Sequence, residues 1–179
     1  MSNYGKRRFY GASSPADYTK HCVIFGPNNT CIINASDDLM YNLNRLIRDL
    51  IMFNKVREFR FVGMGRIDKI CHEIVSEYKK TYKNIRRVLY VERDSWNKAS
   101  HDLPDENALF KEYEEVKYVF TDGLEDRPTF YHRNNYLTMT TDIIGFYIGY
   151  DEDDNPIIYN KQELYSAQRR KKKIFFIKS

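Results

Sequence analysis

The chain has 179 residues, a length typical of one domain, and folding at this length buries roughly 70% of the surface that the unfolded chain exposes. Hydrophobic residues make up 42% and aromatic residues 15% of the chain, which favours a packed core and excludes a disordered protein. The net charge of +4 is too small to indicate a nucleic-acid-binding face, and no apolar run approaches the roughly 20 residues that span a bilayer.

The first elements in chain order are a tail, a strand and a helix. Residues 1–19 are rich in glycine, serine and proline without a sustained period, so we expect a flexible tail followed by a single domain over residues 20–179. An apolar strand is expected at residues 21–26. Ser36 is a suitable N-cap for a helix that runs to Asn54, because leucine and isoleucine recur at helical spacing between them.

The next segment contains the most informative pattern, a strand that turns through glycines into a helix. Residues 59–62 suit a buried strand, and Gly63 and Gly65 can adopt backbone angles that other residues resist. From Ile67 the apolar residues follow a helical period, which predicts a helix ending near Asn84. Such a turn can direct backbone N–H groups toward a nucleotide or phosphate.

The second half continues the alternation of strands and helices. Residues 92–114 have the weakest pattern, with a short helix expected at 106–113. The other expected elements are strands at 86–91, 116–120, 143–148 and 174–177, helices within 128–140 and 162–172, and an acidic loop at 151–156. Unbroken apolar strands that alternate with helices indicate a parallel sheet covered on both faces. The predicted fold class is therefore α/β, a Rossmann-like three-layer sandwich with a mostly parallel central sheet.

In an open parallel sheet, ligands bind beyond the carboxyl ends of the strands. The candidate ligand-binding residues are those that follow strands or begin helices at this edge: Gly26, Gly63, Gly65, Arg66, Asp68, Asp122, Arg133 and Asn134. Arg133 offers a fork of donors for phosphate or carboxylate. Asp68 suits a sugar hydroxyl better than an anion, and on local grounds a helix-capping role is about equally favoured.

Each candidate also has a purely structural interpretation. The glycines can serve only the tight turn, and Arg133 can pair with an acid near Asp122 or Asp126. The basic run at 169–173 is interpreted as a solvated helix end. No metal or cofactor site is predicted, because Cys71, His72 and Glu73 occupy adjacent helical positions that point in different directions. Three cysteines without zinc-site spacing favour reduced thiols in a cytoplasmic protein, with no membrane partner.

Three stretches resemble the YpsA-like branch of the SLOG superfamily, a Rossmann-like group that also holds DNA-processing protein A and the Lonely Guy enzymes. They are the glycine-rich turn at 61–68 with the helix and strand that follow to residue 90, the Arg-Asn helix and strand at 132–144, and the last helix and strand at 165–174. The resemblance covers roughly residues 21–177. It departs from the family pattern after the first strand, where Gly26-Pro27-Asn28 replaces Gly-His-Arg, and before the last helix, where an acidic loop replaces a Gly-Gly turn.

The resemblance implies a nucleotide or nucleotide-derived ligand above the sheet, with Gly63, Gly65 and Asp68 beneath it and Arg133 and Asn134 beside it. It is also compatible with a homodimer.

The main functional hypothesis is binding or sensing of such a ligand. The alternatives are an enzyme that cleaves an N-glycosidic or phosphoribosyl bond, with Asp68, Asp122 or Glu92 as its carboxylate, and a protein- or nucleic-acid-interaction subunit with a degenerate ligand site. Nucleic acid is a less favoured partner, and the Lonely Guy signature Pro-Gly-Gly-x-Gly-Thr is absent.

Overall fold

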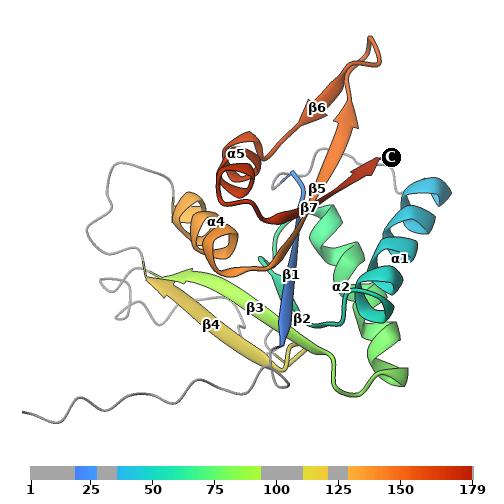
Figure 1. Cartoon of the computed structure of the whole chain (residues 1–179), viewed down its shortest axis with the longest axis vertical. Helices are drawn as coiled ribbons and strands as arrows, with labels where there is room; N and C mark the ends of the chain where they lie inside the picture. Colours follow the sequence, from blue (N-terminus) through green and yellow to red (C-terminus); the bar gives the residue numbers. More distant parts are fainter. Residues whose placement is uncertain (1–18, 28–35, 94–110, 121–128, 179) are drawn as a thin grey trace, which may run out of the picture.

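The computed structural model describes residues 19–27, 36–93, 111–120 and 129–178. Strands and helices alternate along these residues (Figure 1). The elements are β1 (Lys20–Phe25), α1 (Asp37–Met52), β2 (Val56–Phe61), α2 (Arg66–Thr81), β3 (Arg86–Arg93), β4 (Glu115–Phe120), α4 (Thr129–Thr140), β5 (Ile143–Tyr150), β6 (Pro156–Ile158), α5 (Lys161–Arg169) and β7 (Lys173–Lys178).

The seven strands form one sheet in the order β4-β3-β2-β1-β5-β6, with β7 also paired to β5. Every pairing is parallel except that of β5 with β6. The chain builds outward from β1 through β2, β3 and β4, and then returns to the other side of β1 with β5. The strand order therefore reverses between β1 and β5. This arrangement confirms the predicted α/β fold with a mostly parallel central sheet.

The two faces of the sheet carry separate hydrophobic clusters. Successive β1 side chains alternate between them: Ile24 belongs to the cluster beneath α1 and α2, whereas Val23 and Phe25 belong to the cluster beneath α4 and α5. Helices thus cover both faces (Figure 1). Burial on both sides explains why residues 22–25 of β1 and most of β5 are apolar, as the sequence pattern predicts for strands of this kind.

The first helix begins as its sequence predicts. The Ser36 hydroxyl accepts a hydrogen bond from the Leu39 N–H at 3.2 Å, which satisfies one of the unpaired donors at the helix start. The buried residues of α1 are the leucines and isoleucines that set its period. Ser36 therefore fixes where the helix starts, and the apolar period fixes which face it buries.

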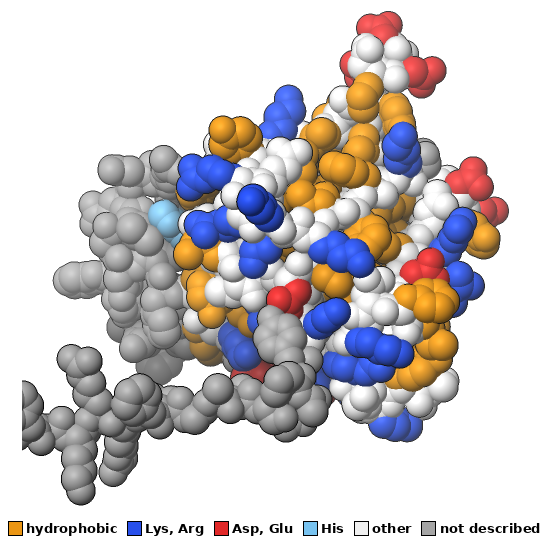
Figure 2. All heavy atoms as spheres, in the orientation of Figure 1, with side chains coloured by type: hydrophobic (Ala, Val, Ile, Leu, Met, Phe, Trp, Pro, Cys, Tyr) orange, Lys and Arg blue, Asp and Glu red, His pale blue; other side chains and the backbone are white. Residues whose placement is uncertain are grey.

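Several boundaries differ from the sequence-based expectation. β2 begins at Val56, earlier than expected, and α5 ends at Arg169, because Lys171 takes a left-handed φ of 54°. β6 was not expected. It pairs antiparallel with the end of β5, so the acidic loop is the turn of a hairpin, and Figure 2 shows carboxylates at its tip.

Some expectations fall on parts of the chain that the structure does not describe. Of the tail expected at 1–19, only Thr19 is described. Of the helix expected at 106–113, only residues 111–113 are described, and they form a turn and a bend. Among the helices in the described ranges, none combines the length and apolar character that crossing a bilayer requires.

Candidate functional site

The β2–α2 loop lies at the carboxyl edge of the sheet, one strand away from the point where the strand order reverses. Gly63 and Gly65 have φ values of 70° and 85°, a region that side chains with a Cβ resist. At Gly63 an added Cβ would also lie 3.0 Å from the Leu89 Cδ1. The two glycines therefore allow β2 to turn directly into α2, as the sequence pattern predicts.

Asp68, in the first turn of α2, closes this loop from the inside. Its carboxylate accepts hydrogen bonds from the N–H groups of Val62 at 3.2 Å and Gly63 at 2.8 Å, and the side chain is buried. Burial raises the pKa of Asp68 to about 7, although these N–H donors and the charge of Arg133 oppose the shift. The N–H groups of Val62 and Gly63 therefore point toward Asp68 and not toward an external ligand.

Arg133 reaches the same loop from α4. Its Nη1 donates to the Val62 carbonyl oxygen at 3.2 Å and lies 2.6 Å from a carboxylate oxygen of Glu92, near the end of β3. The Arg133 side chain is almost completely buried, with 2% of its surface exposed. Asp68 and Arg133 come from elements far apart in the sequence, and both form a hydrogen bond with the backbone of Val62. Among the described residues Arg133 pairs with Glu92, and its other predicted partners, near Asp122 and Asp126, lie outside them.

Asn134 links the two helices on this face of the sheet. Its amide donates to the Glu163 carboxylate at 3.1 Å, and its carbonyl oxygen lies 3.4 Å from the Nε of Arg133. Glu163 lies in the first turn of α5 and is buried. Glu163 could not be predicted from the sequence, because an acid in a first helical turn normally serves the helix dipole at the surface. Only its pairing with Asn134 shows that it faces inward.

The remaining predicted site residues have different positions. A Cβ added at Gly26 would lie only 2.7 Å from the Ile67 Cβ, so this glycine lets α2 pack closely over the end of β1. Arg66 is exposed at the first position of α2. Asp122 lies outside the described residues. Gly26 therefore has a structural role that accounts for its presence, and Arg66 remains an exposed candidate beside the loop.

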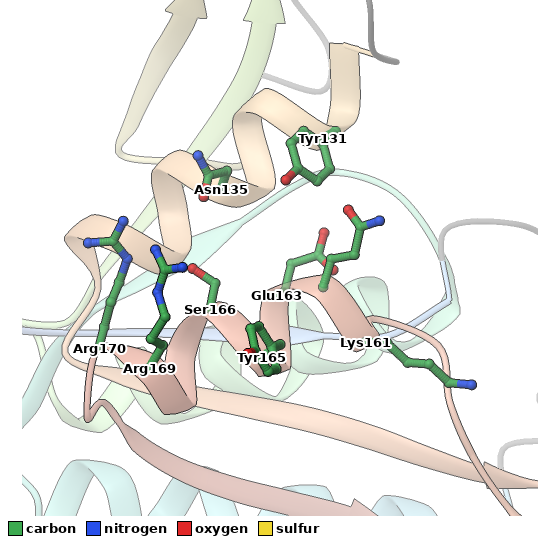
Figure 3. A pocket seen from close by; sticks show the side chains of 9 residues that line it. Tyr131, Asn135, Lys161, Glu163, Tyr165, Ser166, Arg169 and Arg170 are labelled. Atoms are coloured by element: carbon green, nitrogen blue, oxygen red, sulfur yellow. The ribbon is translucent and has the colours of Figure 1, made fainter.

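A groove of about 600 Å³ separates α4 from α5 on the outside of this layer (Figure 3). Figure 3 shows Tyr131 and Asn135 pointing from α4 toward α5, and Glu163, Ser166 and Arg169 pointing from α5 toward α4. Arg170 lines the groove at the same end as Arg169. The groove volume is within the range of about 300–1,000 Å³ that is usual for small-molecule sites.

In the described ranges, no group of three His, Cys, Asp or Glu side chains is arranged to hold a metal ion. No protein-family model matches the chain, and no curated protein is significantly similar to it. We therefore infer a function from the geometry of the carboxyl edge and of the α4–α5 groove.

Proposed function

We propose that this protein binds a nucleotide or nucleotide-derived ligand at the carboxyl edge of the sheet, in the manner of a SLOG-like module. The observation that carries the proposal is the attachment of two buried ionisable side chains, Asp68 and Arg133, to the same residue, Val62. Burying a charge costs several kcal/mol, and a strand-to-helix turn needs no charges to form. Buried ionisable groups gathered at this edge of an α/β sheet are typical of ligand sites.

The charge balance of this edge favours the hydroxyl-bearing part of a ligand. Two carboxyl groups, of Asp68 and Glu92, face one guanidinium, that of Arg133. A phosphate at this position would have to compete with Glu92 for Arg133 and with Asp68 for the loop N–H groups. A ribose hydroxyl, in contrast, can donate to a carboxylate without displacing it. Cys22 and Cys71, the cysteines in the described residues, are buried free thiols and support the cytoplasmic location that forms part of this proposal.

A thermal-shift titration with AMP, ADP, NAD and ADP-ribose tests the proposal. At least one of these ligands should raise the melting temperature of the full chain, and Glu92→Gln should weaken that stabilisation. Glu114→Gln is the matched control, because Glu114 pairs with Arg87 away from this edge. If circular dichroism shows a folded protein that none of the ligands stabilises, the proposal is wrong.

A second candidate function is cleavage of an N-glycosidic bond, and the titration of Asp68 favours it. A carboxyl group with a pKa of about 7 can exchange a proton near neutral pH, as a general acid or base must. Chromatographic detection of free base released from a nucleotide would support this activity. Unchanged release by Asp68→Asn would remove Asp68 from the catalytic role.

A further inference from the structure

The α4–α5 groove has Glu163 and Lys161 at one end and two arginines at the other. Both helices run from the carboxyl edge of the sheet to its amino edge, so Tyr131 and Glu163 lie at one end of the groove, and Arg169 and Arg170 lie at the other (Figure 3). From Glu163 to Arg169 the helix rises by roughly 9 Å. A ligand that spans the groove would therefore meet Glu163 and Lys161 at one end and two guanidinium groups at the other.

The arginine end has the properties of an anion site. Ser166 precedes Arg169 by three residues and Arg170 by four, so the three side chains share one face of the helix. Across the described ranges, the side chains of Arg169 and Arg170 have no carboxylate or hydrogen-bond partner. Figure 2 shows basic side chains gathered over this part of the molecule. Paired guanidinium groups beside a hydroxyl and the Asn135 amide provide donors that match the oxygens of a phosphate.

The favourable position of cations at a helix C-terminus does not by itself explain this arrangement. The helix dipole stabilises a basic side chain wherever its head lies near the last turn. Lys171 follows the last turn directly without lining the groove, and Lys173 instead donates to Asn54. Arg169 and Arg170 differ from both lysines because they border a cavity that is also lined by polar groups of α4.

The β2–α2 loop is a poorer position for a phosphate. The N–H groups of Val62 and Gly63 already donate to Asp68, and Arg133 already pairs with Glu92. The groove lies next to this edge, because Asn134 beside Arg133 donates a hydrogen bond to Glu163, which lines the groove. One ligand can therefore place its hydroxyl-bearing part near the carboxyl edge and its phosphate farther along the groove.

We infer that the α4–α5 groove binds a nucleoside monophosphate-type ligand, with the phosphate on Arg169 and Arg170 and the hydroxyl-bearing part beside Glu163. The ligand class rests on the proposed function. The position of the phosphate is inferred from the groove alone. An experiment can therefore contradict the phosphate position without contradicting the ligand class, and the reverse.

Calorimetric titration of the full chain with AMP and with adenosine tests the inference. Arg169→Gln/Arg170→Gln removes the two guanidinium groups, and Lys171→Gln/Lys173→Gln removes the same charge outside the groove. AMP should bind the wild type at least about tenfold more tightly than adenosine, since hydrogen bonds between charged groups contribute at least about one such factor. The arginine double variant should lose this advantage, whereas the lysine double variant should keep most of it.

Equal affinities for AMP and adenosine, or equal losses in the two double variants, would overturn the inference while leaving nucleotide binding in place. If neither AMP nor adenosine binds, the nucleoside monophosphate class is wrong, and pyrophosphate then tests the phosphate position alone. Pyrophosphate should shift the backbone amide resonances of Asn135 and Ser166 in the wild type and in the lysine double variant, but not in the arginine double variant. The absence of such shifts in the wild type would refute the phosphate position.

Discussion

When the protein folds, the Asp68 carboxyl group leaves water and accepts hydrogen bonds from two backbone N–H groups. This change of environment determines its pKa. The donors and Arg133 favour the carboxylate form, but burial disfavours it more strongly, so the pKa rises from 3.8 to about 7. The folded protein therefore binds a proton that the unfolded chain releases between pH 4 and pH 7. Since the folded state holds more protons in this window, its stability must fall as the pH rises.

We predict that Asp68→Asn removes this pH dependence. The Asp68 contribution to the free energy of unfolding is fully present below pH 4 and lost as the pH rises through 7, a change on the order of 4 kcal/mol. Urea unfolding of the wild type and of Asp68→Asn at pH 5 and pH 8 gives the change in the free energy of unfolding of each protein. The difference between the two changes is the part of the Asp68 contribution that is lost over this range. His21 and His72, whose pKa values are lowered mainly by burial, give the opposite slope, but both are present in each protein and cancel. Identical slopes in the two proteins would contradict the prediction.

At the level of single residues, the sequence located the positions at this edge but not their partners. Gly63, Gly65 and Asp68 could be predicted, because a strand period, two glycines and a helical period follow one another within a short segment. The partners of Arg133 and Asn134 could not be predicted. Glu92 and Glu163 lie 41 residues before Arg133 and 29 residues after Asn134, and only the packing of α4 brings them into contact.

Gly26 shows how one element determines the position of another. α2 places the Ile67 side chain directly over the end of β1, where an added Cβ would lie 2.7 Å from the Ile67 Cβ and 2.8 Å from its Cγ1. These separations are shorter than carbon–carbon contacts allow, so a side chain at residue 26 would push α2 away from the sheet. The close packing of α2 thus accounts for the glycine without a ligand.

We predict that Gly26→Ala lowers the free energy of unfolding by about 1–3 kcal/mol, the usual cost of overpacking a core. In an Ile67→Ala background the added cost should be smaller, because Cγ1 and Cγ2 of Ile67 are then absent. Urea unfolding of the four proteins of this double-mutant cycle measures the coupling. A Gly26→Ala protein of unchanged stability that binds AMP more weakly would instead assign Gly26 to the ligand site.

Whole elements were predicted where local pattern and burial agree. α1 and β5 are clear in the sequence, because their apolar residues follow a single period or fill the strand without interruption. β6 was missed because its three residues, Pro156–Ile158, have no strand pattern of their own. They become a strand only because the turn that precedes them folds back on β5, an interaction set by tertiary structure.

Across the whole molecule, β2 holds α4 at both ends of the helix. At the carboxyl edge the Val62 carbonyl accepts from Arg133, and at the amino edge Arg60 donates to the hydroxyl groups of Thr140 and Thr141. Arg60 also forms a buried ion pair with Glu58 at 2.9 Å. No local pattern could predict these contacts, since charged residues in a strand normally indicate a solvated face, and the two threonines lie 80 and 81 residues away. Together these contacts fix α4, and with it one wall of the groove, relative to the sheet.

We predict that Arg60→Met lowers the free energy of unfolding by about 3 kcal/mol, because it leaves Glu58 buried without its close partner. The value is at the lower end of the usual range, since Arg86 remains 3.4 Å from Glu58. Removing both charges in Glu58→Leu/Arg60→Met should restore more than half of the loss, as replacing a whole buried pair by apolar groups costs little.

Urea unfolding followed by circular dichroism measures all three proteins, with Lys80→Met as a control that breaks an exposed ion pair with Glu77 and should change stability little. If Arg60→Met is no more destabilising than Lys80→Met, or if the double variant is less stable than Arg60→Met, then Arg60 does not stabilise the buried Glu58 carboxylate in the way described.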